Sequence, residues 1–183
     1  MTDAAATARP RLHRAASAAL DRTCTAQAHL PSPLGELLLA RTAHGLAGVW
    51  FEGQKDHPGA LSAPEAPGDD LLERAAGRLQ AYFRGQAVCF DDLPLDLIGT
   101  PFQRAVWQAL CTVGRGATAS YGAIAARVGA PAALRAVGAA IGRNPVSVIV
   151  PCHRVLGAGG ALTGYAGGLQ RKAALLRLEG VRA

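Results

Sequence analysis

Cys152 and His153 are adjacent in this chain of 183 residues, and a cysteine paired with a histidine is the usual way to make sulfur nucleophilic near neutral pH. Pro151 precedes the pair, and the apolar residues 146–150 lead into it. This run predicts a buried strand, which Pro151 ends because proline has no N–H group for a sheet and fixes its own φ angle. A lone cysteine is more often a small buried hydrophobic residue, but the neighbouring histidine and proline favour a nucleophile.

A histidine that acts as a base needs an acceptor to orient its ring. Glu179 is the only carboxylate side chain in residues 101–183, so elimination gives the trio of Cys152, His153 and Glu179. Adjacent side chains often point in different directions, in which case a water molecule would link the sulfur to the ring. Asn144, directly before a proline, is a candidate for holding the turn by hydrogen bonds to the backbone, or simply for ending the preceding helix.

Charge is distributed unevenly along the chain. Residues 1–100 contain nine basic and twelve acidic side chains, whereas residues 101–183 contain ten basic side chains and one acidic one. A cationic half suits a polyanion, and cationic surroundings are also expected to favour the thiolate form of Cys152. Genome composition explains why most basic residues are arginine, but it does not explain the loss of acidic residues from one half.

The composition argues against several other kinds of protein. The four cysteines lie far apart and form no CxxC pair, so we expect neither a zinc site nor a disulfide framework, and we expect a reducing compartment. No stretch approaches the roughly 18 apolar residues of a membrane helix. The chain has no P-loop, and residues 157–160 do not complete a GxGxxG motif. We therefore expect no metal, no cofactor and no membrane contact.

Three helices are predicted in the cationic half. Thr100 is a good N-cap and is followed by Pro101, which suits the first position of a helix. Ser120 caps a second helix over residues 121–128, and a third helix is expected over residues 132–141. The last two helices, joined by a short glycine-containing turn, are typical of a helix-turn-helix.

The third of these helices would be the recognition helix, and most of its side chains are small. Such a helix offers few contacts to base edges in the major groove, but it can bring its backbone close to DNA, even in the minor groove. Arg135 is the long polar residue that stands out on it, and it is either an ordinary surface arginine or a DNA contact. A thiolate cannot reach a base inside the duplex, so chemistry at Cys152 requires a flipped base, whose space Arg135 could fill.

Residues 23–98 are predicted to form a small scaffold domain without a catalytic constellation. Two strands, a helix and a further strand-like segment interrupted by a proline are expected there, at residues 36–41, 46–51, 71–84 and 88–97. Residues 1–22 are rich in Ala, Arg and Ser and lack the apolar core of a secretory signal. Asp3 and Asp21 argue against a mitochondrial leader, so a disordered extension is expected.

The sequence from about Thr100 to Gly180 resembles the O6-alkylguanine-DNA alkyltransferase family, the methylated-DNA–protein-cysteine methyltransferases. The most specific part is PCHRV, preceded by Asn144 and followed by LTGYAGG and RKAALLRLEG. TPFQRAVWQAL, SYGAIAARVG and LRAVGAAIGRNP resemble further family segments in the same order. Residues 31–52 and 71–84 resemble the N-terminal domain of the family more loosely.

The resemblance implies a role for each matching residue of the reacting group. Cys152 would accept the alkyl group, and His153 would act as the base through a water molecule. Glu179 would orient His153. Asn144 is similar to the hinge asparagine that connects the helix-turn-helix to the active-site strand, and Tyr121 would donate to N3 of the flipped guanine.

The resemblance also implies which residues contact DNA and the flipped base. Arg135 would be the intercalating arginine, and the backbone carbonyls of Cys152 and Val155 would accept hydrogen bonds from the exocyclic amine. Many members of the family carry Ser at the position of Ala166, where a backbone N–H contact to O6 would survive the change. The full set assigned to DNA and the base is Arg135, Tyr121, Val155, Tyr165, Ala166, Ser120 and Ala136.

We therefore predict an α+β fold, with a small sheet-plus-helix domain over residues 23–98. A mostly helical, winged-helix-like domain with a helix-turn-helix follows over residues 99–183. The predicted activity is single-turnover DNA repair, in which O6-alkylguanine, and O4-alkylthymine as well, is flipped from double-stranded DNA and its alkyl group passes irreversibly to Cys152. We expect a bacterial cytoplasmic protein of the nucleoid, monomeric and able to cluster cooperatively on DNA.

Two other functions remain open from the sequence. A non-catalytic helix-turn-helix lesion sensor or regulator would have no need for Cys152. A cysteine hydrolase would use Cys152 and His153, but adjacent residues are awkward for a hydrolytic dyad.

Overall fold

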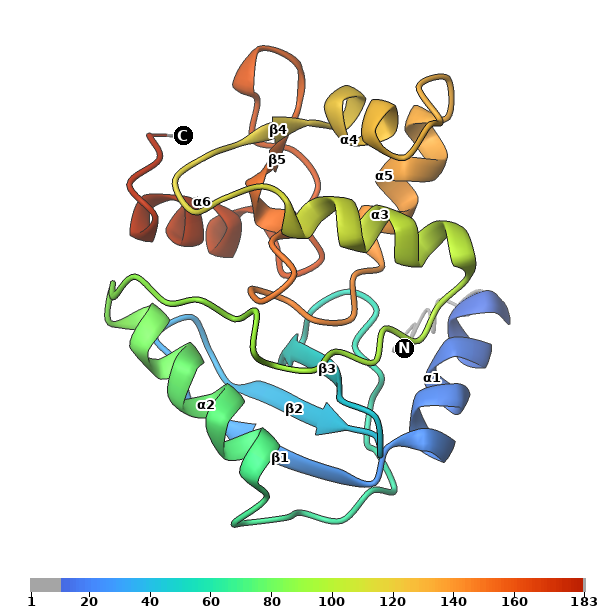
Figure 1. Cartoon of the computed structure of the whole chain (residues 1–183), viewed down its shortest axis with the longest axis vertical. Coiled ribbons are helices and arrows are strands. Elements are labelled where there is room, and N and C mark those ends of the chain that lie inside the picture. Colours follow the sequence, from blue (N-terminus) through green and yellow to red (C-terminus); the bar gives the residue numbers. More distant parts are fainter. Residues whose placement is uncertain (1–10, 183) are drawn as a thin grey trace, which may run out of the picture.

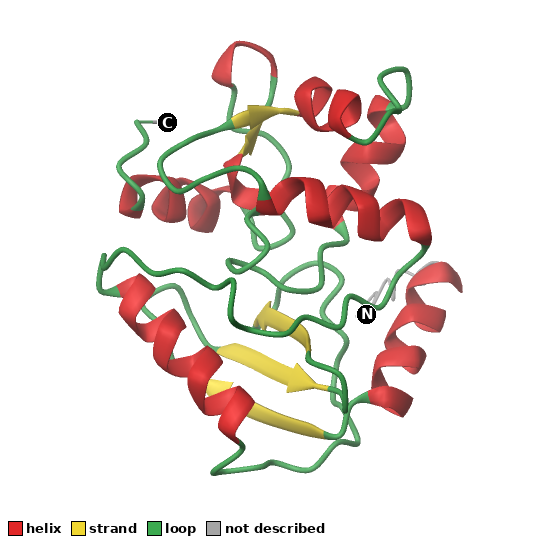
Figure 2. Ribbon diagram, in the orientation of Figure 1, coloured by secondary structure: helices red, strands yellow, loops and turns green. Residues whose placement is uncertain are grey.

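The computed structural model describes residues 11–182 and has an α+β fold, as the sequence predicts. The α-helices are α1 (Arg11–Thr23), α2 (Asp70–Phe83), α3 (Pro101–Cys111), α4 (Tyr121–Arg127), α5 (Leu134–Gly142) and α6 (Leu169–Leu178). The strands are β1 (Ala26–Leu30), β2 (Leu37–Arg41), β3 (Leu46–Phe51), β4 (Ala119–Ser120) and β5 (Val155–Leu156), and two 3₁₀ helices span Cys152–Arg154 and Ala158–Gly160. Figure 1 shows the sheet of β1 to β3 with α1 and α2 in the lower part of the molecule, and α3 to α6 in the upper part. Figure 2 shows the same view coloured by type of element.

The antiparallel sheet β1-β2-β3 is covered on both faces. Successive residues of a strand point to opposite faces. Leu37 and Leu39 of β2 belong to the main apolar core, which includes the buried side of α2. Leu38 and Ala40 belong to a second apolar cluster, which includes Leu20 of α1. Because both of its faces are buried, β2 has a continuous run of apolar residues and not an alternation of apolar and polar ones.

Residues 11–22 correct the expectation of a disordered extension, because they belong to α1. Leu20 is buried in the second cluster with Leu38 and Trp50, on the face of the sheet opposite α2. Asp21 accepts the backbone N–H of Ser62 at 2.6 Å. The helix forms because the fold provides an apolar surface for it, which the alanine-rich sequence does not reveal. Residues 1–10 of the expected extension lie outside the described residues.

Residues 88–97 correct a second expectation, because they form an irregular connection with a turn at residues 91–93, and not a strand. Leu95 makes one isolated bridge with Leu46. The N–H of Leu46 donates to the Pro94 carbonyl at 2.7 Å, and the N–H of Asp96 donates to the Leu46 carbonyl at 2.9 Å. Pro94 has no N–H group with which to extend a ladder, so the segment passes along the edge of the sheet and leads to α3.

The helix-turn-helix is present as α4 and α5, and both helices pack against α3. Thr100 caps α3 in a capping box with Gln103, as its position before Pro101 predicts. The Trp107 indole N–H donates to the Ala140 carbonyl at 2.8 Å and ties α3 to α5. Helix α5 begins at Leu134, two residues later than expected, because residues 130–133 form a turn closed by a backbone hydrogen bond.

The short strands β4 and β5 join the helix-turn-helix to the segment that contains the cysteine. They pair in parallel, with Ala119 opposite Val155 and Ser120 opposite Leu156. Because β4 leads directly into α4, and β5 directly follows Cys152–Arg154, the pairing fixes the start of α4 relative to the Cys–His pair.

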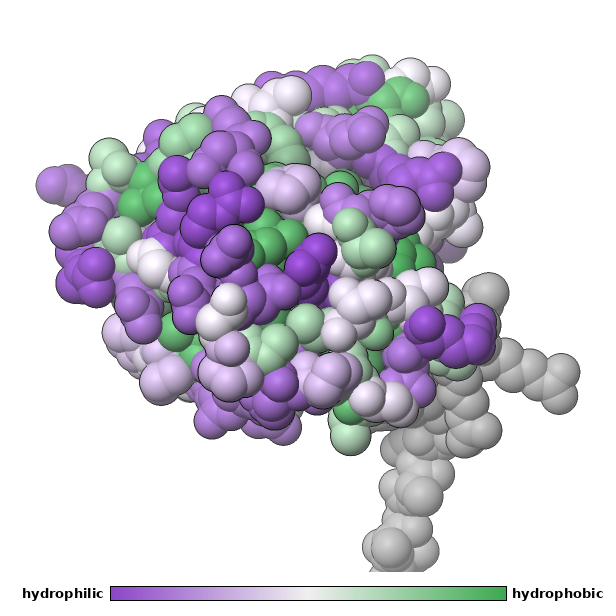
Figure 3. Space-filling view, turned by 60° about the horizontal axis from the view of Figure 1, so that its bottom comes forward, coloured by the Kyte–Doolittle hydropathy of each residue, from purple (hydrophilic) through white to green (hydrophobic). Residues whose placement is uncertain are grey.

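Hydrophilic residues cover most of the face in Figure 3, which brings the lower end of the Figure 1 view forward. Among the described residues, Leu134 and Leu169 are large hydrophobic side chains that remain exposed. None of the helices in residues 11–182 combines the length and apolar character that crossing a bilayer requires.

Candidate active site

The apolar residues 146–150 form a buried turn and not the strand that their composition predicts. Val146 makes one isolated bridge to β3, and the N–H of Val150 donates back to the Val146 carbonyl at 2.9 Å. Val148 has a φ of 72°, a left-handed conformation that β-branched residues rarely adopt. The burial of these residues is as expected, but only the start of the turn pairs with β3, where the N–H of Ser147 donates to the Val49 carbonyl at 2.9 Å. The rest is held by Asn144 and by hydrogen bonds within the turn.

Asn144 lies between the end of α5 and the cysteine and makes the backbone hydrogen bonds expected of it. Its Oδ1 atom accepts the N–H of Val146 at 3.0 Å, and its Nδ2 atom donates to the Val150 carbonyl at 2.8 Å. The same Nδ2 atom also donates to Sγ of Cys152 at 3.1 Å. One buried amide therefore determines both the shape of the turn and the polar environment of the sulfur.

Cys152 begins the 3₁₀ helix Cys152–Arg154 and is 5% exposed. Burial raises the pKa of its thiol, while the hydrogen bond from Asn144 and the positive charge of Lys172 act in the opposite direction. This corrects the expectation that cationic surroundings favour the thiolate, because burial has the larger effect. A reaction at this sulfur therefore needs a base to take the proton.

His153 and Glu179 form the buried pair that the sequence predicts by elimination. Nε2 of His153 lies 2.9 Å from Oε1 of Glu179, and both side chains are fully buried. Burial lowers the pKa of His153 despite the neighbouring carboxylate, so the imidazole is neutral in the fold. Since Nε2 donates to Glu179, Nδ1 is the ring nitrogen that can accept a proton. This Nδ1 atom is buried and has no hydrogen-bond partner among residues 11–182.

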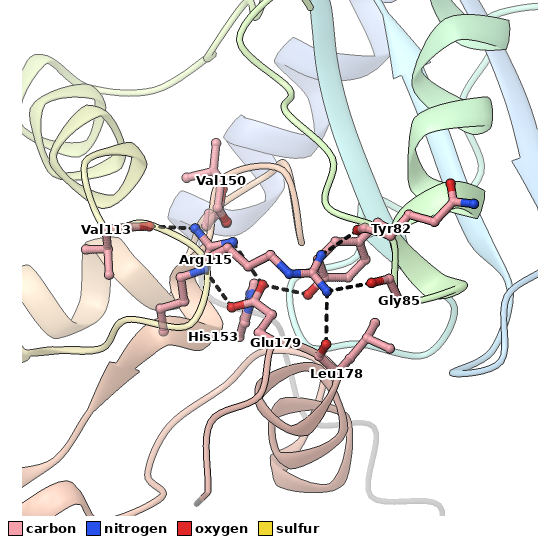
Figure 4. Close-up of polar contacts among 11 residues, drawn as sticks. Tyr82, Gly85, Val113, Arg115, Val150, His153, Leu178 and Glu179 are labelled. Atoms are coloured by element: carbon pink, nitrogen blue, oxygen red, sulfur yellow. Dashed lines mark hydrogen bonds and ion pairs between the residues drawn. The ribbon is translucent and has the colours of Figure 1, made fainter.

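Glu179 accepts hydrogen bonds from two further residues that sequence reasoning missed (Figure 4). Arg154 donates from Nε to Oε2 at 2.8 Å and from Nη2 to Oε1 at 2.9 Å. The hydroxyl of Tyr82, on α2, donates to Oε1 at 2.8 Å. Burial opposes ionisation of Glu179, but the hydrogen bonds from His153 and Arg154 outweigh it and lower its pKa.

Lys172 is a third residue that the sequence interpretation missed. It is fully buried on α6, and its ammonium group donates to the carbonyls of Val155, Thr163 and Gly164. Burial lowers its pKa to about 8. The only signal in the sequence is that lysine is rare in this chain; its burial becomes visible only in the fold.

A pocket of about 410 Å³ lies beside this cluster, between α5 and the segment before α6. Tyr121 lines it, and its hydroxyl lies 3.3 Å from the Thr163 carbonyl, to which it donates. Burial raises the pKa of Tyr121, and the nearby Cys152 contributes to the rise. Cys152 is not itself a lining residue, whereas three of the predicted base-contacting residues are. The lining includes Tyr121, Tyr165, Ala166, Gly138, Arg143 and Lys55.

The remaining predicted residues lie on or near the helix-turn-helix. Arg135 and Ala136 are exposed in the first turn of α5. Ser120 caps α4, where its hydroxyl accepts the N–H of Ala123 at 3.0 Å. Val155 is fully buried, and its carbonyl already accepts from Lys172. A carbonyl oxygen has two lone pairs, so one acceptor position of Val155 remains.

The fold and the site define a two-part α+β protein with a helix-turn-helix, a buried cysteine that accepts a hydrogen bond from an Asn, and a buried His–Glu pair whose His directly follows the cysteine. Comparison with known protein families gives the same class. Residues 101–181 match the family model "6-O-methylguanine DNA methyltransferase, DNA binding domain". Residues 27–97 match "6-O-methylguanine DNA methyltransferase, ribonuclease-like domain".

The chain belongs to the 6-O-methylguanine DNA methyltransferase family. It is 49% identical over 154 residues to the methylated-DNA–protein-cysteine methyltransferase of Mycobacterium tuberculosis H37Rv, covering 84% of this chain and 92% of that relative. It is 40% identical to the protein of that description from Haemophilus influenzae, covering 82% and 84%. The crystal structure of M. tuberculosis O6-methylguanine methyltransferase superposes with a TM-score of 0.76 at 48% identity, covering 86% of this chain and 93% of that one. A structure described as M. tuberculosis OGT in complex with DNA has the same TM-score at 47% identity, with 84% and 92% covered.

Proposed function

We propose that this protein repairs alkylated DNA by moving an alkyl group from O6 of guanine, and from O4 of thymine, to the sulfur of Cys152. The observation that supports this most directly is the buried cluster in which Asn144 donates to the sulfur and Glu179 orients His153. Relatives described as methylated-DNA–protein-cysteine methyltransferases support the same function, as does the related structure in complex with DNA.

His153 supplies the base in the proposed reaction. Its Nδ1 atom takes the thiol proton through a water molecule, and Glu179 stabilises the imidazolium that forms. The sulfur then attacks the alkyl carbon in line with the bond to O6. A carbon–sulfur bond forms as the carbon–oxygen bond breaks, and the electron pair of the broken bond stays on the purine.

Tyr121 assists departure of the purine anion by donating its phenolic proton to N3. The proton held by His153 then returns to the phenolate through solvent, so both groups end as they began. The product on Cys152 is a thioether, which no group in the site can reverse. Each protein molecule therefore reacts once, and repair consumes the protein in a one-to-one ratio with the lesion.

The target base has to leave the duplex before it can meet the sulfur. Arg135 is exposed at the start of α5, where it can enter the stack in place of the flipped base. The neighbouring Ala136 and the other small residues of α5 allow the backbone to approach the minor groove closely. We assign Ser120, at the N-terminus of α4, to the same DNA-contacting surface.

The pocket beside the cysteine is the proposed site of the flipped base. The carbonyls of Cys152 and Val155 accept from its exocyclic amine, and the lone pair of Val155 not used by Lys172 is sufficient for this contact. Tyr165 and Ala166 form the lid. Because alanine has no hydroxyl, the contact from Ala166 to O6 is made by its backbone N–H.

The protein is proposed to act as a monomer that clusters on DNA in the bacterial cytoplasm, at the nucleoid. The reducing conditions there keep the acceptor thiol available.

The test is an intact-protein mass spectrum after mixing with duplex DNA that carries one O6-methylguanine, followed by peptide mapping. One added methyl group on Cys152, saturating at one per molecule, is the expected result. The matched control is Cys152→Ser, which should bind the DNA and gain no mass. Lesion-dependent binding without added mass in the wild type would indicate a sensor instead. Neither added mass nor lesion preference would leave only a helix-turn-helix DNA-binding protein.

A further inference from the structure

Tyr82 brings the N-terminal half of the molecule into contact with the base of the proposed reaction. It lies on α2, is 1% exposed, and donates its hydroxyl to Oε1 of Glu179 at 2.8 Å. The same oxygen accepts from Nε2 of His153 and from Nη2 of Arg154, each at 2.9 Å. Of these three donors, Tyr82 is the one that belongs to the sheet-containing half.

Arg115 holds the ring of Tyr82 in place. Its guanidinium lies over that ring, 5.4 Å from the centroid. It also donates to the carbonyl of Gly85, just after α2, and to that of Leu178, directly before Glu179, at 3.1 and 3.0 Å (Figure 4). One side chain thus joins the end of α2 to the end of α6, so the fold itself determines the separation of Tyr82 and Glu179.

We infer that Tyr82 is a positioning residue for alkyl transfer, which acts through Glu179 on His153; this inference rests on the proposed function of Cys152. A carboxylate that receives fewer hydrogen bonds keeps more negative charge for its remaining partners. Donation from Tyr82 therefore limits how strongly Glu179 favours the protonated form of His153. The hydroxyl helps to keep the imidazole neutral, which is the form that can accept the thiol proton.

Cations also surround this cluster and act in the same direction. Burial is the main cause of the lowered pKa of His153, and the positive charges of Arg154 and Lys172 contribute to it. Removing the hydroxyl of Tyr82 changes none of these charges, so its effect can be measured separately. The titratable groups that face the cluster from the neighbouring elements are Arg115, Cys152, Arg154, Tyr165 and Lys172.

The test is the single-turnover rate constant for methyl transfer from duplex DNA, measured between about pH 5 and 8 for the wild type and Tyr82→Phe. The variant retains the ring and loses only the donor. His153 should then be protonated more readily. The acid limb, which is the fall of the rate constant at low pH as His153 becomes protonated, should therefore move to higher pH by about half a unit or more. Replacing Tyr82 with a fluorotyrosine, a stronger donor of the same shape, should move the limb to lower pH.

Phe90→Leu is the matched control, because the Phe90 ring packs against Tyr82 with centroids 6.1 Å apart but takes no part in the hydrogen bonds to Glu179. It should lower the melting temperature without moving the acid limb. If all three variants have the wild-type profile while the wild type still transfers methyl groups, the inference is wrong and the proposed function stands. A wild type that transfers no methyl group would overturn both.

Discussion

Cys152, the proposed nucleophile, lies in surroundings that oppose its ionisation. Burial raises the pKa of the thiol, and the donor of Asn144 and the charge of Lys172 only partly compensate. The reactivity of a cysteine depends on its thiolate. In the proposed reaction, proton transfer to His153 therefore accompanies the attack, and Glu179 makes that transfer favourable.

Replacing Asn144 with Asp would test the two hydrogen bonds that its Nδ2 atom donates. Asp keeps an oxygen for the N–H of Val146 but has no N–H to donate to Cys152 or to Val150. A hydrogen bond to a charged group contributes about 1.5–3 kcal/mol, so methyl transfer should slow by about 10- to 100-fold. The pKa of Cys152 should rise further, which the pH dependence of its reaction with iodoacetamide would measure.

Ser147→Ala is the control for Asn144→Asp. Ser147 lies in the same turn, but its hydroxyl donates to Oε1 of Gln54, at 3.3 Å, and not to the sulfur. Its iodoacetamide profile should match the wild type. An unchanged profile for Asn144→Asp would show that the amide does not stabilise the thiolate.

The lowered pKa of Glu179 leads to a prediction of how the stability of the fold depends on pH. Hydrogen bonds lower its pKa in the fold despite burial, whereas in the unfolded chain the carboxyl titrates near about 4.3. The unfolded state therefore binds the proton first, so the contribution of Glu179 is complete above that pH. It is lost as the pH falls through the folded value. The free energy of unfolding, measured with denaturant, should decrease below about pH 5.

Glu179→Gln should remove this part of the acid dependence. It should also lower stability at neutral pH by about 3 kcal/mol, because Arg154 would keep a largely buried charge without its carboxylate. A wild type and a Glu179→Gln variant with parallel pH profiles would contradict the assignment of the lowered pKa to this residue.

At the scale of elements, local signals predict the helices better than the strands. The predicted N-caps Thr100 and Ser120 are confirmed, because the N-terminus of a helix depends on a few neighbouring residues. Residues 146–150 have the composition of a buried strand, but beyond Ser147 the chain leaves β3 and turns back, with the Val150 carbonyl bonded to the amide of Asn144. Helix α1 depends on an apolar surface of the sheet that only the complete fold provides.

The same distinction applies to the candidate site. Cys152, His153 and Glu179 can be identified because the first two are adjacent and the third is the sole acidic residue of its half. Tyr82 is 97 positions before Glu179, and its local sequence describes only an amphipathic helix. Lys172 likewise looks like an ordinary basic residue of a surface helix. Contacts of this kind follow from packing between elements and have no local signal.

Arg135 is exposed on α5, which leads to a prediction about the helix-turn-helix. If its guanidinium replaces the flipped base, Arg135→Ala should slow methyl transfer from duplex DNA by about tenfold or more. Reaction with the free base O6-benzylguanine should change little, because no base has to be extruded. Single-turnover rates on both substrates measure the difference.

Arg177→Ala is the matched control, since Arg177 is an exposed arginine on α6 and not on the helix-turn-helix. It should leave both rates close to those of the wild type. Equal losses on duplex DNA and on the free base in Arg135→Ala would exclude Arg135 from base extrusion.

At the scale of the whole molecule, the sheet-containing half and the helical half pack together as one body. The N–H of Val49 on β3 donates to the Pro145 carbonyl, and the Val49 carbonyl accepts the N–H of Ser147, both at 2.9 Å. The turn before the cysteine is thus held by the sheet of the other half. Arg171 of α6 crosses the same boundary, with its guanidinium 4.8 Å from the centroid of the Phe51 ring. The main apolar core contains residues from both halves.

This continuity predicts that alkylation of Cys152 destabilises the entire protein. Cys152 is 5% exposed, and its turn is bonded to Asn144 and to β3, so an added methyl group has little free space. Overpacking of a packed site costs about 1–3 kcal/mol, which corresponds to a melting temperature lower by several degrees in a chain of this size. Calorimetry of the free and the methylated protein would measure it, with Cys152→Ser treated with the same DNA as the control. Equal melting temperatures would mean that the turn yields locally to the methyl group, and the tight coupling of the site to the sheet would then be wrong.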